Sequence, residues 1–300
     1  MDMIKRLIRK LRNLPSHQEI SGLYFLQKTT NLENHILHDK QPGISNQKYC
    51  DTDITVSLTT YGKRLRDVCF TIESIMQQTL LPNKIVLNID YSYKGQRLPE
   101  ALNKQMNRGL EINFCKDIRS YKKLIPTLKK YPDSSILTID DDVIYNFDFI
   151  ELFVDSYRVH PTKIHAGRTH VMTFKPDGSL KSYNNWIMCS SNCNNPRHLF
   201  FTGVGGVLYP PGSLDEEVTN EEVFTKICPL ADDVWFNAMA LKNGTEINKV
   251  PTRNDRGEEY ILNESVQDIG LFNINTGIRC ENDRQIEAVY TKYDLFKLLR

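Results

Sequence analysis

Three consecutive aspartates are the first feature of this sequence that suggests chemistry. Asp140, Asp141 and Asp142 follow the apolar stretch 135–139, which is typical of a buried strand. Adjacent carboxylates repel one another, and a hard divalent cation with oxygen ligands offsets that repulsion. Because alternate side chains along a strand point the same way, Asp140 and Asp142 could share one ion while Asp141 faces elsewhere. A cap for a helix beginning near Phe147 needs only one aspartate, so we favour a metal site.

An ion of the magnesium type usually keeps a phosphate group as a co-ligand. The chemistry this suggests is displacement of a diphosphate leaving group, whose developing charge the cation neutralises. No glycine-rich phosphate loop accompanies the aspartates, since Thr60-Tyr61-Gly62-Lys63 matches neither GxGxxG nor a P-loop. The segment Gly203-Val-Gly-Gly206 indicates either a tight turn or a backbone that approaches a ligand closely.

A second acidic pair, Asp232 and Asp233, falls at the predicted start of a helix over 231–242. Acidic residues there complement the helix dipole, which is a purely structural role. They could equally supply a general base that removes the proton of an acceptor hydroxyl. The residues alone leave both interpretations open.

Alternating strands and helices must position these groups. Such alternation predicts a parallel sheet with helices on both faces, in which ligands bind beyond the carboxyl ends of the strands. We therefore expect Thr59 to Gly62, Asp90 and the three aspartates to face one crevice. The strands are predicted over 54–59, 84–90, 111–115 and 135–139, with helices over 64–78, 98–107 and 121–130. Strands over 166–174 and 199–209 and a helix over 283–299 complete the pattern.

Composition sets limits on the class of protein. The chain has 300 residues and a net charge of +1, so as a whole it lacks the charge of a nucleic-acid-binding protein. Its seven cysteines are an odd, scattered set, which favours reduced thiols. Cys189 and Cys193 form a CxxxC pair whose nearest histidine is His198, and zinc would need two more ligands.

The N-terminal residues suggest a short basic amphipathic helix. Leucine and isoleucine recur at helical spacing between 4 and 14, and five lysines and arginines lie among them. Such a helix either lies on an anionic membrane surface or docks on the protein's own core. No run of 18 apolar residues and no signal peptide occurs, so we expect a cytoplasmic protein, with peripheral contact to the inner face of the cell membrane as one interpretation. We expect a linker with one helix, over 20–27, to follow.

Six segments in order resemble GT-A glycosyltransferases, in particular the family 2-like bacterial enzymes of surface-polysaccharide assembly. The resemblance spans 54–242 and implies a GT-A catalytic domain over 51–245. Around it stand an N-terminal helix and linker over 1–50 and an extension over 246–300 that completes the acceptor side. The segments are Val56–Gly62, Ile85–Asp90, Ser120–Pro126, Leu137–Asp142, Thr202–Pro211 and Pro229–Trp235.

The resemblance implies roles for individual residues on the donor side. The nucleotide is most often a uridine diphosphate, and the metal Mn²⁺ or Mg²⁺. Asp140 and Asp142 would form the DxD pair that holds ribose and metal, with Asp141 counted among the donor-binding residues. The remaining donor-binding residues would be Thr59, Thr60 and Tyr61 around the nucleoside, Asp90 at the base, Lys122 or Lys123 at the diphosphate, and Gly205 and Gly206 beside the donor sugar or acceptor.

The implied reaction is transfer of a hexose to a hydroxyl of a glycan or lipid-linked glycan. Asp232 or Asp233 matches the acidic pair that supplies the catalytic base in inverting members, and we prefer Asp233. The QxxRW signature of processive synthases is absent, which favours transfer of a single sugar. Candidates for a third metal ligand are His165, His170 and His198.

Three rival functions remain open. A haloacid-dehalogenase-like phosphatase also carries an aspartate pair after an apolar strand, but normally after the first strand. Ile144 also stands here where that motif has threonine or valine. A sugar-nucleotide-forming nucleotidyltransferase usually has a glycine-rich basic loop that Tyr61-Gly62-Lys63-Arg64 does not match. The third is a non-catalytic carbohydrate-binding protein.

Overall fold

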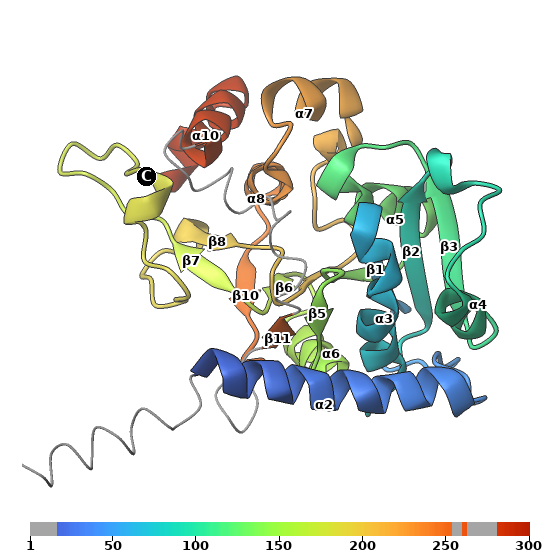
Figure 1. The fold of residues 1–300 in the computed structure, drawn as a ribbon. Helices are drawn as coiled ribbons and strands as arrows, with labels where there is room; N and C mark the ends of the chain where they lie inside the picture. Colours follow the sequence, from blue (N-terminus) through green and yellow to red (C-terminus); the bar gives the residue numbers. More distant parts are fainter. Residues whose placement is uncertain (1–16, 254–259, 263–280) are drawn as a thin grey trace, which may run out of the picture.

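A seven-stranded sheet forms the centre of the molecule (Figure 1). The computed structural model of the chain describes residues 17–253, 260–262 and 281–300, so the predicted N-terminal helix over 4–14 lies outside it. The strand order is β10-β6-β9-β4-β1-β2-β3, and only β9 runs antiparallel to its neighbours. The strands are β1 (Ile54–Thr59), β2 (Lys84–Asp90), β3 (Leu110–Cys115), β4 (Ser135–Thr138), β6 (Ile164–Ala166), β9 (Val207–Tyr209) and β10 (Ile247–Lys249).

Two short antiparallel pairs lie outside this sheet: β5 (Val143–Ile144) with β11 (Ile261–Leu262), and β7 (Thr169–Val171) with β8 (Leu199–Phe201). The α-helices are α2 (His17–His38), α3 (Val68–Met76), α4 (Glu100–Met106), α5 (Ile125–Lys130), α6 (Phe149–Val159), α7 (Glu221–Ile227), α8 (Asp232–Asn243) and α10 (Glu281–Lys292). The 3-10 helices are η1 (Gly62–Arg66), η2 (Tyr91–Tyr93), η3 (Arg119–Lys123), η4 (Tyr183–Asn185), η5 (Pro196–His198), η6 (Glu216–Thr219) and η8 (Leu295–Leu299).

Neighbouring residues of β4 show that helices cover both faces of the sheet. Ile136 packs into a core shared with α5, α8 and α10, whereas Leu137 packs into a second core shared with α3, α4 and α6. Successive side chains of a strand point to opposite faces, so one strand supplies both cores. The predicted α/β class, a mostly parallel sheet with helices on both faces, is confirmed.

Several predicted elements are divided or extended. The helices expected over 64–78 and 121–130 each begin as a 3-10 turn, η1 and η3, before α3 and α5. The strand expected over 199–209 is two strands, β8 and β9, because Gly205 and Gly206 adopt φ values of +87° and +86° in the turn between them. The strand expected over 166–174 is the shorter β7, and β6 ends at residue 166, where that strand was expected to begin. The helix α2 runs well beyond the helix expected over 20–27.

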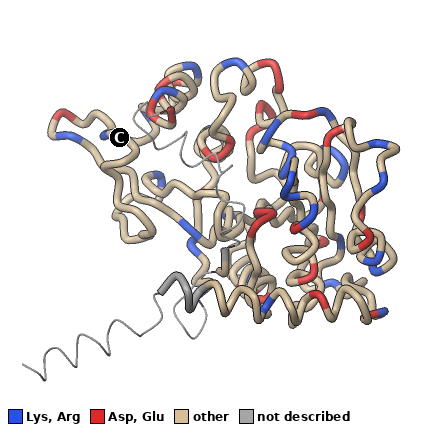
Figure 2. The backbone as a smooth tube through the Cα atoms, viewed as in Figure 1, with Lys and Arg blue, Asp and Glu red and all other residues tan. Residues whose placement is uncertain are grey.

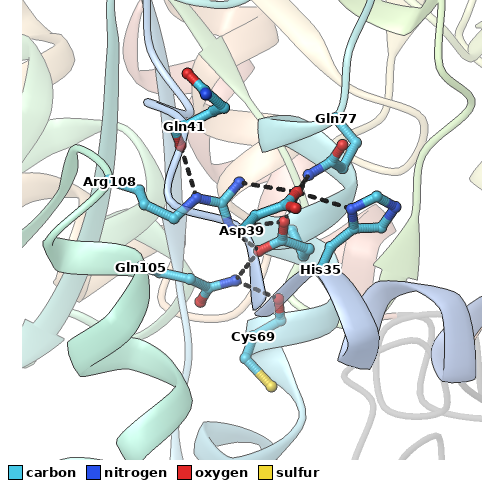
Figure 3. A network of polar contacts seen from close by, with 8 residues as sticks. His35, Asp39, Gln41, Cys69, Gln77, Gln105 and Arg108 are labelled. Atoms are coloured by element: carbon cyan, nitrogen blue, oxygen red, sulfur yellow. Dashed lines mark hydrogen bonds and ion pairs between the residues drawn. The ribbon is translucent and has the colours of Figure 1, made fainter. Parts of the chain in front are cut away.

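A buried polar network explains why α2 and the residues after it are ordered against α3 and α4 (Figure 3). Glu73 is fully buried and accepts a hydrogen bond of 2.8 Å from Arg108. Gln77 donates to both Glu73 and Asp39, at 2.9 Å each, and Asp39 pairs with His35 of α2 at 2.8 Å. Sequence periodicity does not reveal such a network, because its members come from separate elements.

None of the helices in the part of the chain that the structure describes has both the length and the hydropathy needed to cross a bilayer. Basic and acidic segments are interspersed over the fold (Figure 2), in keeping with the near-zero net charge.

Candidate functional site

The candidate site lies where the winding of the sheet reverses. The chain winds from β1 through β2 to β3 on one side, and β4 pairs with the other edge of β1. In open α/β sheets, ligands bind in the crevice at the carboxyl ends of the strands that flank this reversal. Thr59 ends β1, and Asp140 follows β4 closely, so the structure brings these predicted residues to one edge of the sheet.

Asp141 ties the ends of β1 and β4 together. Its carboxylate accepts a hydrogen bond of 2.6 Å from the hydroxyl of Thr60 and one of 2.8 Å from Arg64. The hydroxyl of Thr71 on α3 donates to its backbone carbonyl oxygen at 3.1 Å. Burial raises the pKa of Asp141, although the charge of Arg64 and both hydrogen bonds oppose that shift. Asp141 and Thr60, both expected beside the nucleotide, are thus engaged with each other.

Asp140 and Asp142 each contact a cation of the chain itself. Lys123 donates to Asp140 at 2.8 Å, and a guanidinium nitrogen of Arg64 lies 3.2 Å from Asp142. The hydroxyl of Tyr145 accepts a hydrogen bond from the backbone N–H of Asp140 at 3.0 Å. Among the described residues, no three His, Cys, Asp or Glu side chains gather in a way that could hold a metal ion.

The second acidic pair opens α8 and lies close to the same lysine. The Oδ2 atom of Asp232 is buried, has no hydrogen-bond partner among the residues that the structure describes, and lies 3.8 Å from Nζ of Lys123. Asp233 accepts a hydrogen bond of 2.9 Å from the backbone N–H of Gly203. Burial and the negative charge of Asp232 raise the pKa of Asp233 to about 7, against the opposing charge of Lys123. A carboxylate with this pKa suits proton abstraction near neutral pH.

The residues expected around the nucleoside lie at the carboxyl ends of β1 and β2. Asp90 accepts a hydrogen bond of 2.9 Å from the backbone N–H of Ser92, and Nζ of Lys122 lies 3.8 Å from its carboxylate. Lys122 is buried and pairs more closely with Asp117, at 2.8 Å. Tyr61, at 45% exposure, is accessible to a ligand. Nucleoside binding by these residues remains a prediction.

Local geometry accounts for Gly205 and Gly206, two of the three glycines between β8 and β9. A Cβ on Gly206 would lie 2.6 Å from the ring of Phe149 on α6. Gly205 has a φ of +87°, a backbone conformation that glycine adopts without strain. The tight-turn interpretation is therefore sufficient, and contact of Gly205 or Gly206 with a sugar remains a prediction.

The three histidines considered as metal ligands all have partners in the protein. His165 contacts the hydroxyl of Ser156 at 2.7 Å, and burial lowers the pKa of both His165 and His170 to about 4. His170 accepts from the backbone of Cys189 at 3.0 Å, and His198 contacts the Leu299 carbonyl oxygen at 2.8 Å. The six described cysteines are free thiols.

Arg64 and Gly203 make contacts in the site that the sequence analysis did not assign to them. Arg64 neutralises two of the three aspartates, and Gly203 supplies a backbone N–H to Asp233. A sequence signal for Arg64 existed, because a basic pair follows the first strand directly. The Gly203–Gly206 segment was singled out from the sequence, but the hydrogen bond from Gly203 to Asp233 was not, since that contact depends on the fold.

No family model matches the chain. A search of curated proteins also finds no match. Among solved structures, a mannosyltransferase from Pyrobaculum calidifontis in complex with GDP-Man and Mn²⁺ is similar, with 14% identity and a TM-score of 0.46 over 91% of this chain and 71% of that one. A CMP:2-keto-3-deoxy-manno-octonic acid synthetase complexed with CTP is also similar, with 11% identity and a TM-score of 0.39 over 66% of this chain and 89% of that one.

Proposed function

We propose that this protein is a metal-assisted GT-A glycosyltransferase that moves a sugar from a nucleotide diphosphate sugar to an acceptor hydroxyl. One observation carries the proposal: the cluster Asp140–Asp142 and the pair Asp232–Asp233 meet around Lys123 at the carboxyl ends of β1 and β4. The cluster Asp140–Asp142 suits a metal ion with a bound diphosphate, and the pair Asp232–Asp233 can supply a catalytic base. We further propose a UDP-sugar as donor, a glycan or lipid-linked glycan as acceptor, and inversion at the transferred carbon.

Asp140 and Asp142 fit a hard divalent cation. Both offer carboxylate oxygens, the ligands that Mg²⁺ and Mn²⁺ prefer, and two protein ligands leave coordination positions for phosphate oxygens. When bound, such an ion neutralises charge on the departing diphosphate.

The chain's own residues account for the remaining tasks. Asp233, whose pKa is raised to about 7, would accept the proton of the attacking hydroxyl. Lys123 and Lys122 would approach the diphosphate, and Asp90 and Tyr61 would contact the nucleoside.

The C-terminal extension supports the catalytic domain that we propose over 51–245. Gln285 on α10 is fully buried, and its side-chain oxygen accepts from the backbone N–H groups of Leu230 and Ala231 at 2.9 and 3.2 Å. These bonds fix the start of α8, where Asp232 and Asp233 stand. We therefore propose that 246–300 completes the acceptor side.

The proposed function is tested by transfer assays after a ligand screen. A panel of nucleotide sugars, screened by thermal shift with and without Mn²⁺, should identify a donor that raises the melting temperature. Asp140→Asn and Asp142→Asn should then abolish transfer or donor hydrolysis while the protein stays folded.

Full activity in Asp142→Asn, or after exhaustive chelation, would contradict the metal role. Release of pyrophosphate from a nucleoside triphosphate would identify a nucleotidyltransferase instead. Hydrolysis of simple phosphate esters would identify a phosphatase, and sugar-nucleotide binding without hydrolysis a non-catalytic binding protein.

We also propose peripheral membrane contact through residues 1–14, on the basis of their sequence. Deleting them should leave transfer intact and reduce sedimentation with vesicles that contain anionic lipid. Unchanged sedimentation would remove this proposal without affecting the catalytic one.

A further inference from the structure

Lys123 is held firmly at the centre of the acidic site. Its carbonyl oxygen accepts a hydrogen bond of 2.6 Å from the hydroxyl of Ser57, a buried residue of β1. Its side chain is 14% exposed and reaches the carboxylate of Asp140 at 2.8 Å and that of Asp232 at 3.8 Å. The sheet thus fixes the backbone from which this ammonium group extends.

The groups around the ammonium of Lys123 are close to it and mostly negative. A Cβ on Gly203 would lie 3.0 Å from Nζ of Lys123 and 3.1 Å from a carboxylate oxygen of Asp233, so glycine permits both to approach the backbone. Within the described part of the chain, the buried Oδ2 atom of Asp232 has no hydrogen-bond partner, and the nearby ammonium is the charge that compensates it. Lys123 therefore balances one carboxylate that follows β4 and one at the start of α8.

This arrangement conflicts with metal binding at Asp140 as long as Lys123 stays in place. The ammonium contacts the same carboxylate that would bind the ion. An ammonium and a metal ion on one carboxylate repel each other strongly in a largely buried site. Arg64 acts similarly at Asp142, but it also pairs with the buried Asp141, which keeps it in place. Among the carboxylates of the described residues, only that of Asp140 lies within hydrogen-bond distance of Lys123, because Asp232 is 3.8 Å away. Lys123 is therefore the cation that can be redirected.

We propose that Lys123 is a resident counter-ion that competes with the divalent metal for Asp140 and yields to it when a nucleotide diphosphate is present. The diphosphate offers the ammonium an alternative anion, so Asp140 becomes free for the metal. Metal and nucleotide then strengthen each other's binding reciprocally. This inference rests on the proposed function, whose donor it concerns.

The test measures binding of Mn²⁺ alone, by the loss of its free-ion electron paramagnetic resonance signal. Lys123→Met should bind Mn²⁺ roughly tenfold or more tightly than the wild type, because a competing charge is removed. Lys84→Met is the matched control, since Lys84 pairs with Asp53 at 2.7 Å at the opposite end of the strands. The control should bind Mn²⁺ as the wild type does, and adding Asp140→Asn to Lys123→Met should abolish the gain. UDP should strengthen Mn²⁺ binding more in the wild type than in Lys123→Met.

Lys123→Gln provides a second variant, because an amide can still donate to Asp140 without carrying charge. Its melting temperature should rise more with added Mn²⁺ than that of the wild type. Unchanged Mn²⁺ affinity in the folded Lys123 variants, or a gain that survives Asp140→Asn, overturns the inference. These readouts need no sugar donor. If the wild type turns over a nucleotide sugar but the Lys123 variants bind Mn²⁺ no more tightly, only the inference is refuted. If the Lys123 variants bind Mn²⁺ more tightly but the wild type uses no nucleotide sugar in the panel, only the proposed function is refuted.

Discussion

The hydroxyl of Thr60 donates a hydrogen bond of 2.6 Å to Asp141 and so connects the residues that follow β1 and β4. Arg64 completes the contact at 2.8 Å from the same carboxylate. The middle aspartate of the triplet is therefore a structural tie between two central strands, while Asp140 and Asp142 on either side carry the charges expected to face a ligand.

Asp141→Ala should destabilise the fold by about 3 kcal/mol, because it removes one partner of a buried ion pair and leaves Arg64 less well compensated. Urea denaturation followed by circular dichroism measures the change. The exposed Asp133, next to the same strand, is the control, and its alanine variant should lie within about 0.5 kcal/mol of the wild type. Equal stabilities for the two variants would show that Asp141 does not tie the strands.

Under the proposed function, transfer activity should rise with pH through about 7. Asp233 must be deprotonated to accept a proton, and burial together with the charge of Asp232 raises its pKa to about 7. A profile of kcat against pH should therefore climb and level off above that value. Asp233→Asn should lower kcat by roughly 10² to 10⁴-fold and affect donor affinity little. If Asp232→Asn has this effect and Asp233→Asn does not, the base is Asp232.

The same raised pKa makes a prediction about stability. An unfolded chain loses the Asp233 proton near the ordinary pKa of 3.8, whereas the folded protein keeps it until about pH 7. Between these values the folded state binds more protons, so the contribution of Asp233 to stability falls as pH rises. Asp233→Asn should remove this decline from melting temperatures recorded between about pH 4 and pH 7, the window set by the two pKa values. An unchanged pH dependence would argue that Asp233 titrates normally.

The strands of the first half could be predicted because period-2 patterns and strand ends are local properties of the sequence. The same strand ends predict that the site residues lie at one edge of the sheet. The strand order was not predicted, because it depends on which strands pair; the parallel pairing of β1 with β4 is what brings Thr59 and Asp140 to one edge. The division of 199–209 into β8 and β9 was missed because the glycines at its centre act through backbone conformation. Apolar periodicity does not report that conformation.

The contacts within the site could not be predicted in the same way. The pairing of Lys123 with Asp140 and of Arg64 with Asp142 depends on side chains from separate elements. The buried Glu73 likewise looks like one polar residue in an apolar helix until Arg108 is brought against it. Residue types identify which charges are available, and the fold decides which of them meet.

Gly206→Ala should destabilise the protein more than Gly212→Ala does. Both glycines have positive φ, +86° and +70°, so both variants carry the same kind of backbone strain. A Cβ on Gly206 would also meet Phe149 at 2.6 Å, whereas a Cβ on Gly212 would meet nothing within 4 Å. The difference should be about 1–3 kcal/mol, the usual cost of overpacking a core. Thermal denaturation measures it, and equal losses would mean that Phe149 moves aside freely.

Removing one partner of the buried pair Glu73–Arg108 should lower the free energy of unfolding strongly, whereas neutralising both partners should lower it much less. Arg108→Met leaves the fully buried carboxylate of Glu73 without its cation and should cost about 3–5 kcal/mol. Adding Glu73→Gln should restore much of that loss, because the remaining buried groups are then neutral. Urea denaturation of the wild type, both single variants and the double variant gives the coupling free energy.

The exposed pair of Lys130 and Glu111, at 2.6 Å, is the matched control for this cycle. Its coupling should be about 1 kcal/mol or less, since water screens both partners. Arg108→Met should also increase proteolytic cleavage of α2, because Arg108 anchors the segment after that helix through the carbonyl oxygen of Gln41 at 2.8 Å. If the buried pair couples no more strongly than the exposed one, burial of Glu73 does not explain how α2 is held against α3 and α4.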